Sequence, residues 1–316
     1  MTVLNTHRPS GTGADDVRVR RGGGIHSGDR VWGYLLIAPL SIGLGVFYLW
    51  PIVQTIYLSF TASTGFGDPQ WTGLSNYAAL FTEPDLPVAL VHTILFTVVT
   101  VVVGTAIATV IAVLLNQKGL RGRSIYRVLY FVPVVTLPVA SGMVWRYIFN
   151  GDFGLVNQFL GWFGIKGPHW LADPNFALWA VIVVSIWMGL GTTIVIILAG
   201  LQTIPVELYE AAELDGAGGI RQFFSLTLPL LTPSLFFVSV LSTIAALQVF
   251  DLVYVMVGPT NPALPSSITV VFLFYQQAFL NNQPGAAAAT AIVLMLLIGL
   301  ITLGQFRLQK RWVNYV

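Results

Sequence analysis

Six long apolar runs dominate the chain, and each is long enough to cross a bilayer as a helix. About twenty predominantly apolar residues span the ~30 Å hydrocarbon layer. The runs lack the two-residue alternation of barrel strands, so they predict helices, whose backbone groups are satisfied within the segment. The predicted spans are 31–60, 88–116, 124–149, 176–201, 230–257 and 286–306.

Composition supports the same interpretation. Only 9% of the 316 residues are charged, against roughly 25% in a soluble domain, and 55% are apolar or aromatic. We therefore expect an all-α, polytopic membrane protein with one transmembrane domain, residues 31–316. Residues 1–30 are polar and aperiodic, which predicts a disordered tail. The chain has no cysteine and no HExxH pattern, so neither a disulfide framework nor metal chemistry is expected.

The basic residues predict the orientation. If the N-terminus is cytoplasmic, 13 of the 15 Lys and Arg residues fall on the inner side. These are Arg8, Arg18, Arg20, Arg21, Arg30, Lys118, Arg121, Arg123, Arg127, Arg221, Arg307, Lys310 and Arg311. By the positive-inside rule, both termini are cytoplasmic, and residues 61–87, 150–175 and 258–285 are ordered outer connectors. Lys118, Arg121 and Arg123 are expected to set this topology and to meet anionic headgroups.

The longest inner connection, residues 203–229, is polar and broken by glycines. Residues 204–214 predict a short helix, because Pro205 suits a first turn and Glu207 favours a helix start. Glycines at 216, 218 and 219 then predict a turn. A second helix, 220–226, leads to Pro229, which can begin the fifth span. The segment is too polar for lipid and too apolar for water alone, so it predicts a docking surface for a protein.

The same segment carries a resemblance to a known family. Glu210-Ala211-Ala212, Gly216 and Leu228-Pro229 have the spacing of the EAA signature of permease subunits of bacterial binding-protein-dependent ABC importers. Leu226 stands where the family usually has isoleucine. Residues 122–127, 142–145 and 248–254 further resemble the maltose/glycerol-3-phosphate type of carbohydrate importer. The chain departs from that group at 257–259, where a threonine and a glycine pair commonly precede proline.

The resemblance implies a division of labour between chains. The loop would be a coupling helix that docks on a cytoplasmic ATPase dimer through Glu210, Ala211, Ala212, Asp215, Gly216, Leu228 and Pro229. The sequence has no GxxxxGK[ST] loop, so a partner ATPase is expected to bind ATP and Mg²⁺, and no cofactor is expected on this chain. A second permease subunit, an extracytoplasmic solute-binding protein and membrane lipid are the other expected partners, and nucleic acid is not. A heterodimer of permeases is expected, with a homodimer left open.

The substrate path is predicted in the fifth span. Gln248, Asp251 and Tyr254 are three apart and would share one helical face. Ionisable residues at membrane depth usually face a bundle interior or a water-filled path. The three residues could form a hydrogen-bonding wall for a hydroxylated solute or bond to a neighbouring helix. Both interpretations stay open.

Several other polar residues have a simpler expected role. Arg146, beside Trp145, is expected to extend to the membrane interface, although it could meet an anionic solute. Small residues of the fourth span and the start of the sixth are expected to serve helix packing. They are Ser185, Gly189, Thr192, Thr193 and 286–289. Arg221 could pair with Glu213, with Asp215 or with a partner protein.

The leading hypothesis is a permease subunit of an ATP-driven importer for a sugar or related polyol, working by alternating access and not an enzyme itself. The alternatives are an ion-coupled carrier, a membrane scaffold and an intramembrane enzyme. An enzyme would need clustered catalytic polar residues in the spans, whereas the sequence places one carboxylate there. Few basic residues reach the predicted path, which favours a neutral solute.

Overall fold

The computed structural model describes residues 27–62, 69–117 and 119–313. Most of the predicted tail, residues 1–26, and Lys118 lie outside this described part. The chain divides into two compact units at Val53 and Gln54. The N-terminal unit contains α1 (Ser27–Leu44), a π-helical segment (Gly45–Leu49) and the start of α2 (Trp50–Ser59). The predicted first span is therefore helical, although the helix already begins within the last residues assigned to the tail.

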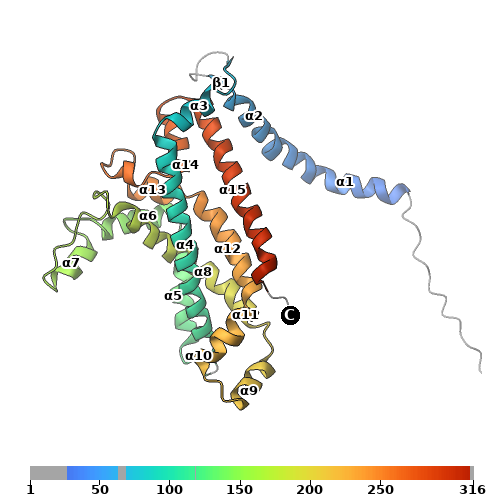
Figure 1. Cartoon of the computed structure of the whole chain (residues 1–316), viewed down its shortest axis with the longest axis vertical. Coiled ribbons are helices and arrows are strands. Elements are labelled where there is room, and N and C mark those ends of the chain that lie inside the picture. Colours follow the sequence, from blue (N-terminus) through green and yellow to red (C-terminus); the bar gives the residue numbers. More distant parts are fainter. Residues whose placement is uncertain (1–26, 63–68, 118, 314–316) are drawn as a thin grey trace, which may run out of the picture. The chain divides into compact units, whose positions relative to one another are not determined.

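The C-terminal unit is built on long helices that agree with three predicted spans. They are α4 (Asp85–Asn116), α8 (Ala177–Leu201) and α15 (Pro284–Trp312), which match the second, fourth and sixth spans. α4, α8, α12 (Thr232–Leu247) and α15 pack into one bundle (Figure 1). Among the described residues of both units, four helices are long and apolar enough to cross a membrane. The number is six if two bent helix pairs each count as one span.

The third span is one of these bent pairs, so the prediction of a single helix over 124–149 was wrong. α5 (Arg123–Val135) and α6 (Pro138–Ile148) meet at 110°. Pro138 has no N–H to continue the helix, and Thr136 and Leu137 before it are extended, as residues preceding proline often are. The Thr136 hydroxyl donates to the Pro133 carbonyl at 2.8 Å and so satisfies one carbonyl at the end of α5.

The fifth span is broken twice, so a single helix over 230–257 was also wrong. The segment 219–230 meets α12 at 66°, with Leu231 at the bend. Pro229 therefore does not begin the span but lies within the preceding helical turn, α11 (Leu228–Leu230). At its other end α12 stops at Leu247, and the short helix α13 (Asp251–Met256) follows.

The described residues of the connectors predicted as outer loops are ordered, and one of these connectors enters the core. The first holds a two-stranded antiparallel sheet, β1 (Thr61–Ala62) with β2 (Gln70–Trp71), and α3 (Ser75–Thr82). The second holds α7 (Leu155–Gly161). The third, 258–285, holds a 3₁₀ turn (Leu264–Ser266), α14 (Val270–Tyr275) and a π-helical turn (Gln276–Leu280). Because Val270 and Phe272 are fully buried, this segment is part of the core and not a surface connector.

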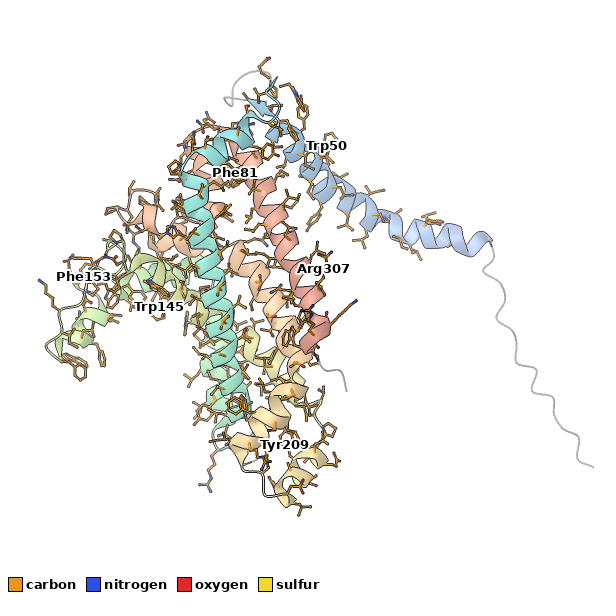
Figure 2. The ribbon with its side chains drawn as sticks, viewed as in Figure 1. Trp50, Phe81, Trp145, Phe153, Tyr209 and Arg307 are labelled. Carbon is orange, nitrogen blue, oxygen red and sulfur yellow. The ribbon has the colours of Figure 1, made fainter. Side chains whose placement is uncertain are left out.

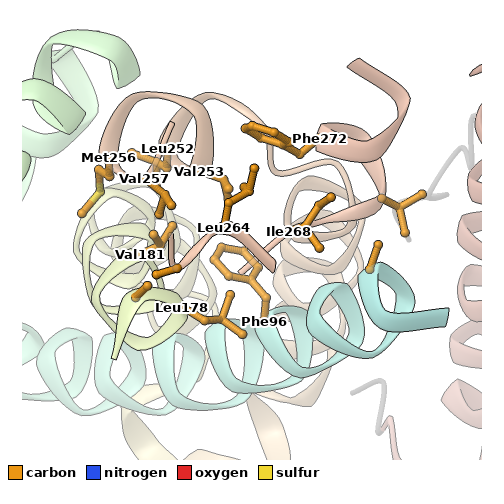
Figure 3. Close-up of a cluster of buried hydrophobic side chains, with 14 of the residues drawn as sticks. Phe96, Leu178, Val181, Leu252, Val253, Met256, Val257, Leu264, Ile268 and Phe272 are labelled. Carbon is orange, nitrogen blue, oxygen red and sulfur yellow. The ribbon is translucent and has the colours of Figure 1, made fainter. Parts of the chain in front are cut away.

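The main apolar core lies between α4, α8, α13 and α14. Phe96, Val181, Val253 and Phe272 belong to this core, and each is buried completely (Figure 3). A second core forms where the other halves of α4, α8 and α12 meet, around Ala108, Ile194, Ile197, Leu231 and Val238. Three of the alanines predicted to pack, Ala287, Ala288 and Ala289, are buried at the start of α15, which confirms that expectation.

Candidate functional site

The loop 203–229 is a helical hairpin at one end of the bundle (Figure 1). α9 (Val206–Leu214) is followed by a turn, then α10 (Gly219–Gln222), a π-helical turn (Phe223–Thr227) and α11. The two helices and their order agree with the prediction. The second one is longer than predicted, because it continues through the π-helical turn into α11.

The spacing of the EAA residues from Gly216 has a structural explanation. Gly216 has a φ of +73°, in the left-handed region that favours glycine. Its N–H donates to Glu213 O at 3.0 Å, and Ala217 N–H donates to Ala212 O at 2.9 Å. Together these bonds form a Schellman motif, which caps the last carbonyls of a helix. In this motif the residue four positions after Ala212, here Gly216, has the left-handed conformation, which glycine adopts most readily. Gly218, by contrast, has an ordinary φ of −67°.

The outward face of this hairpin is exposed. The side chains of Glu210, Ala211 and Asp215 are exposed, as is Gly216, while Ala212 is half-buried. Leu228 and Pro229 are half-buried and lie on the second helix. Leu214 is 90% exposed and Ile220 80% exposed, so two large apolar side chains flank the EAA residues. Arg221 is exposed in α10, and its partner stays a prediction.

The predicted substrate-path residues do not share one helical face. Thr269 donates its hydroxyl to Val249 O at 3.1 Å, and this carbonyl would otherwise accept the next bond of α12. Phe250 has φ −136° and ψ −57°, outside the helical range, and α13 begins only at Asp251. The backbone break therefore separates Gln248 from Asp251 and Tyr254, and the prediction that the three share one helical face was wrong.

The three residues have different surroundings. Gln248 donates to Ile244 O at 3.0 Å and lines a groove of about 390 Å³ beside α14 and α15. Asp251 is exposed in the first turn of α13. Tyr254 belongs to an aromatic cluster, with its ring centroid 5.3 Å from Phe250 and 5.2 Å from Tyr275. Whether any of them contacts solute stays a prediction.

A small cavity of about 150 Å³ lies inside the bundle instead. It is lined by residues of α4, α8, the end of α12 and the break after α12, namely Phe96, Thr100, Gly104, Thr105, Ser185, Ile186, Gly189, Leu190, Thr193, Ser242, Ala245, Ala246 and Val249. The buried Thr100 hydroxyl has no hydrogen-bond partner in the described part of the chain. A buried unpaired hydroxyl is costly unless a molecule in the cavity bonds to it.

This cavity changes the interpretation of the fourth span. Ser185, Gly189 and Thr193 line it, and a Cβ added to Gly189 would meet nothing within 4 Å. The close packing predicted for Gly189 was therefore wrong. The tight contact falls at Gly191, where an added Cβ would overlap the Tyr130 carbonyl oxygen of α5. Thr192 is exposed. The sequence does not show whether a single hydroxyl-bearing residue in an apolar run lines a cavity or packs against another helix.

Arg146 lies at the end of α6, outside both the hairpin and the cavity. Arg146 is exposed at the end of α6, and its Nη1 donates to Val255 O of α13 at 3.4 Å. Within the described residues, no three His, Cys, Asp or Glu side chains gather to hold a metal ion. The features with functional potential are thus the exposed hairpin and the hydroxyl-lined cavity.

Comparison with known proteins identifies the architecture. A family model for the inner membrane component of binding-protein-dependent transport systems matches residues 104–315. The probable ABC transporter permease protein YesP of Bacillus subtilis (strain 168) is 36% identical over 309 residues, or 97% of this chain and 98% of YesP. The arabinooligosaccharides transport system permease protein AraP of Halalkalibacterium halodurans is 34% identical over 276 residues, 87% of this chain and 86% of AraP.

The fold is also that of a solved importer. A chain of a bacterial ABC transporter involved in the import of the acidic polysaccharide alginate superposes with a TM-score of 0.79 at 21% identity. The match covers 90% of this chain and 97% of that chain. This protein therefore belongs to the inner membrane components of binding-protein-dependent transport systems: it is a multi-pass permease subunit of an ABC importer of the cytoplasmic membrane.

Proposed function

We propose that this permease carries a neutral sugar or related polyol and that the bundle cavity is part of the solute path. The cavity presents the hydroxyl-bearing residues Thr100, Thr105, Ser185, Thr193 and Ser242. Hydroxyl groups can donate and accept, as the hydroxyls of a sugar do. The AraP relative is named for the transport of arabinooligosaccharides, which supports the same solute class. A phosphorylated solute would need cationic side chains, whereas the side chains that line the cavity are neutral.

The hairpin end of the bundle is proposed to face the cytoplasm, with both termini on that side. Thirteen of the 15 basic residues support this orientation under the positive-inside rule. A partner ATPase dimer then binds ATP and Mg²⁺ and docks on α9, so this chain itself hydrolyses no ATP. A second, different permease subunit completes the pore, and an extracytoplasmic binding protein delivers the solute. Rigid-body motion of the bundles exposes the path to each side in turn.

The Schellman turn at Gly216 carries the coupling proposal, and the two glycines of this turn offer contrasting variants. Gly216→Val places a β-branched residue at a positive φ, whereas Gly218→Ala meets open space at an ordinary φ. Both glycines lie in the same exposed turn, just before α10 begins at Gly219. The first variant should misdirect α9 and the second should leave it in place.

The test is ATP-driven uptake by the complete importer in proteoliposomes, with its binding protein and a panel of neutral oligosaccharides, an acidic oligosaccharide and a sugar phosphate. We expect Gly216→Val and Glu210→Ala to abolish uptake and to reduce co-purification of the ATPase, while Gly218→Ala behaves as the unmodified chain. Normal uptake by both altered proteins would refute the coupling role. This chain alone, under a pH gradient, should take up nothing, and uptake there would favour the ion-coupled carrier.

A further inference from the structure

A side-chain hydrogen bond joins the two arms of the hairpin. The hydroxyl of Tyr209, in α9, lies 3.0 Å from the hydroxyl of Thr227, at the end of the π-helical turn. Thr227 is 4% exposed and lies 3.4 Å from Gln222 O, to which its hydroxyl can also donate. Either hydroxyl of the Tyr209–Thr227 pair can be the donor, because each carries one proton and can also accept. Tyr209 lies at the hairpin end of the bundle (Figure 2).

A further bond extends this connection to the turn. Gln222 Nε2 donates to the Ala217 carbonyl at 2.9 Å, directly after the left-handed Gly216. The Tyr209–Thr227 bond, the Thr227–Gln222 bond and the Gln222–Ala217 bond therefore connect α9, the turn and α10 in sequence. We call these four residues the hairpin network.

Little else holds α9 against the bundle. The helix has no buried residue, and a hollow of about 660 Å³ lies between it, the ends of α4 and α8, and the second arm. Tyr209 is half-buried and packs against the second core, as Leu226 and Leu230 of the second arm also do. A force applied to the exposed face of α9 could therefore displace this helix alone, unless Tyr209 ties it to the second arm.

The second arm is continuous in sequence with α12, whose far part lines the cavity. α10, the π-helical turn and α11 form one helical segment over 219–230, which bends at Leu231 into α12. The far part of α12 carries Ser242, Ala245 and Ala246, which line the cavity. Bonded elements that move as one body can transmit a displacement over such a distance.

We propose that Tyr209 is a positioning residue that makes α9 and the 219–230 segment move together, so that motion of the ATPase reaches α12. The proposal rests on the proposed function and names a residue outside the EAA signature. Without the Tyr209 hydroxyl, α9 still docks on the ATPase, but its displacement is no longer passed fully to α12.

The absence of cysteine in the chain provides a readout that needs no knowledge of the solute. Ser242→Cys introduces a single thiol into this subunit at the cavity. The complete importer is assembled with this variant, and maleimide labelling of the subunit is followed with and without ATP and vanadate. ATP hydrolysis and ATPase co-purification are measured on the same samples.

We expect ATP and vanadate to change the labelling rate when Tyr209 is intact. Tyr209→Phe should reduce this change about fivefold, because one hydrogen bond shifts a two-state equilibrium by about that factor. ATPase co-purification and basal hydrolysis should be unchanged. Thr227→Val should have the same effect, Thr227→Ser should retain the response, and Tyr209→Phe with Thr227→Val should add nothing further. Tyr126→Phe, a 45% exposed tyrosine of α5, is the matched control.

Two outcomes would overturn the inference alone: an unchanged labelling response in Tyr209→Phe, or a loss of response that parallels loss of the ATPase and so reflects assembly. If ATP changes labelling in no version of the importer, including the one with Tyr209 intact, then alternating access and this inference both fall.

Discussion

α8 and the α12–α13 segment are both apolar and both contribute to the main core, but only α8 keeps an unbroken backbone. α8 is held by close approach, since Gly191 lies against the backbone of α5 and Gly200 against Ser234 of α12. The α12–α13 segment instead gives up a turn of helix at 248–250, where Thr269 bonds to the freed Val249 carbonyl.

The comparison shows how a helix break is tolerated in a buried bundle. Each freed backbone group needs a new partner, because an unsatisfied one costs several kcal/mol in an apolar environment. Threonines supply these partners here. Thr269 bonds to Val249 O, and the fully buried Thr93 of α4 accepts from the Val270 N–H at the start of α14. In these two regions, glycine allows the close approach of the intact helix, and threonine bonds to the backbone at the break or at a helix start.

The largest effect is expected from the same substitution at two glycines of α8. Gly191→Ala forces a Cβ onto the Tyr130 carbonyl, so we expect a loss of about 3 kcal/mol of stability. Gly189→Ala faces open space and should be neutral or stabilise by up to about 1 kcal/mol through helix propensity. Reversible unfolding in mixed detergent micelles measures both. Equal stability of the two variants would mean that close approach does not hold α8.

A smaller effect is expected where a threonine satisfies the broken backbone. Thr93→Val should cost about 2 kcal/mol, because it leaves the Val270 N–H buried without an acceptor. Thr97→Val, one turn further along α4, removes only a bond to the carbonyl of Thr93 within the same helix and should cost less than about 1 kcal/mol. The same unfolding assay measures the stability of both threonine variants. A cost for Thr97→Val as large as that for Thr93→Val would refute the role given to Thr93.

The smallest change in stability is expected at the exposed start of α13. Asp251→Asn removes a charge from a first helical turn and should cost below about 1 kcal/mol. If Asp251 contacts a hydroxylated solute, KM for uptake should rise about fivefold while the fold is retained. Glu83→Gln, an exposed carboxylate beside α3, is the control. An unchanged KM for Asp251→Asn would remove this residue from the solute path.

Much of the candidate site followed from residue types and spacing. The two short helices and the left-handed Gly216 were predictable, because glycine and helix propensity act over a few neighbouring residues. The cavity and the hairpin network were not. Ser185 and Ser242, and likewise Tyr209 and Thr227, are far apart in sequence, and only packing decides that such side chains meet.

The sequence by itself determined the membrane location, the number and order of the apolar segments, and the polar hairpin between the fourth and fifth of them. These features depend on hydrophobicity and on local backbone preferences. The tertiary structure decided where the third and fifth segments break, that α14 enters the core, and which hydroxyl groups line a cavity. A break costs hydrogen bonds of the same helix, and these are replaced by local bonds such as Thr136 to Pro133 O and by bonds from residues distant in sequence, such as Thr269 to Val249 O.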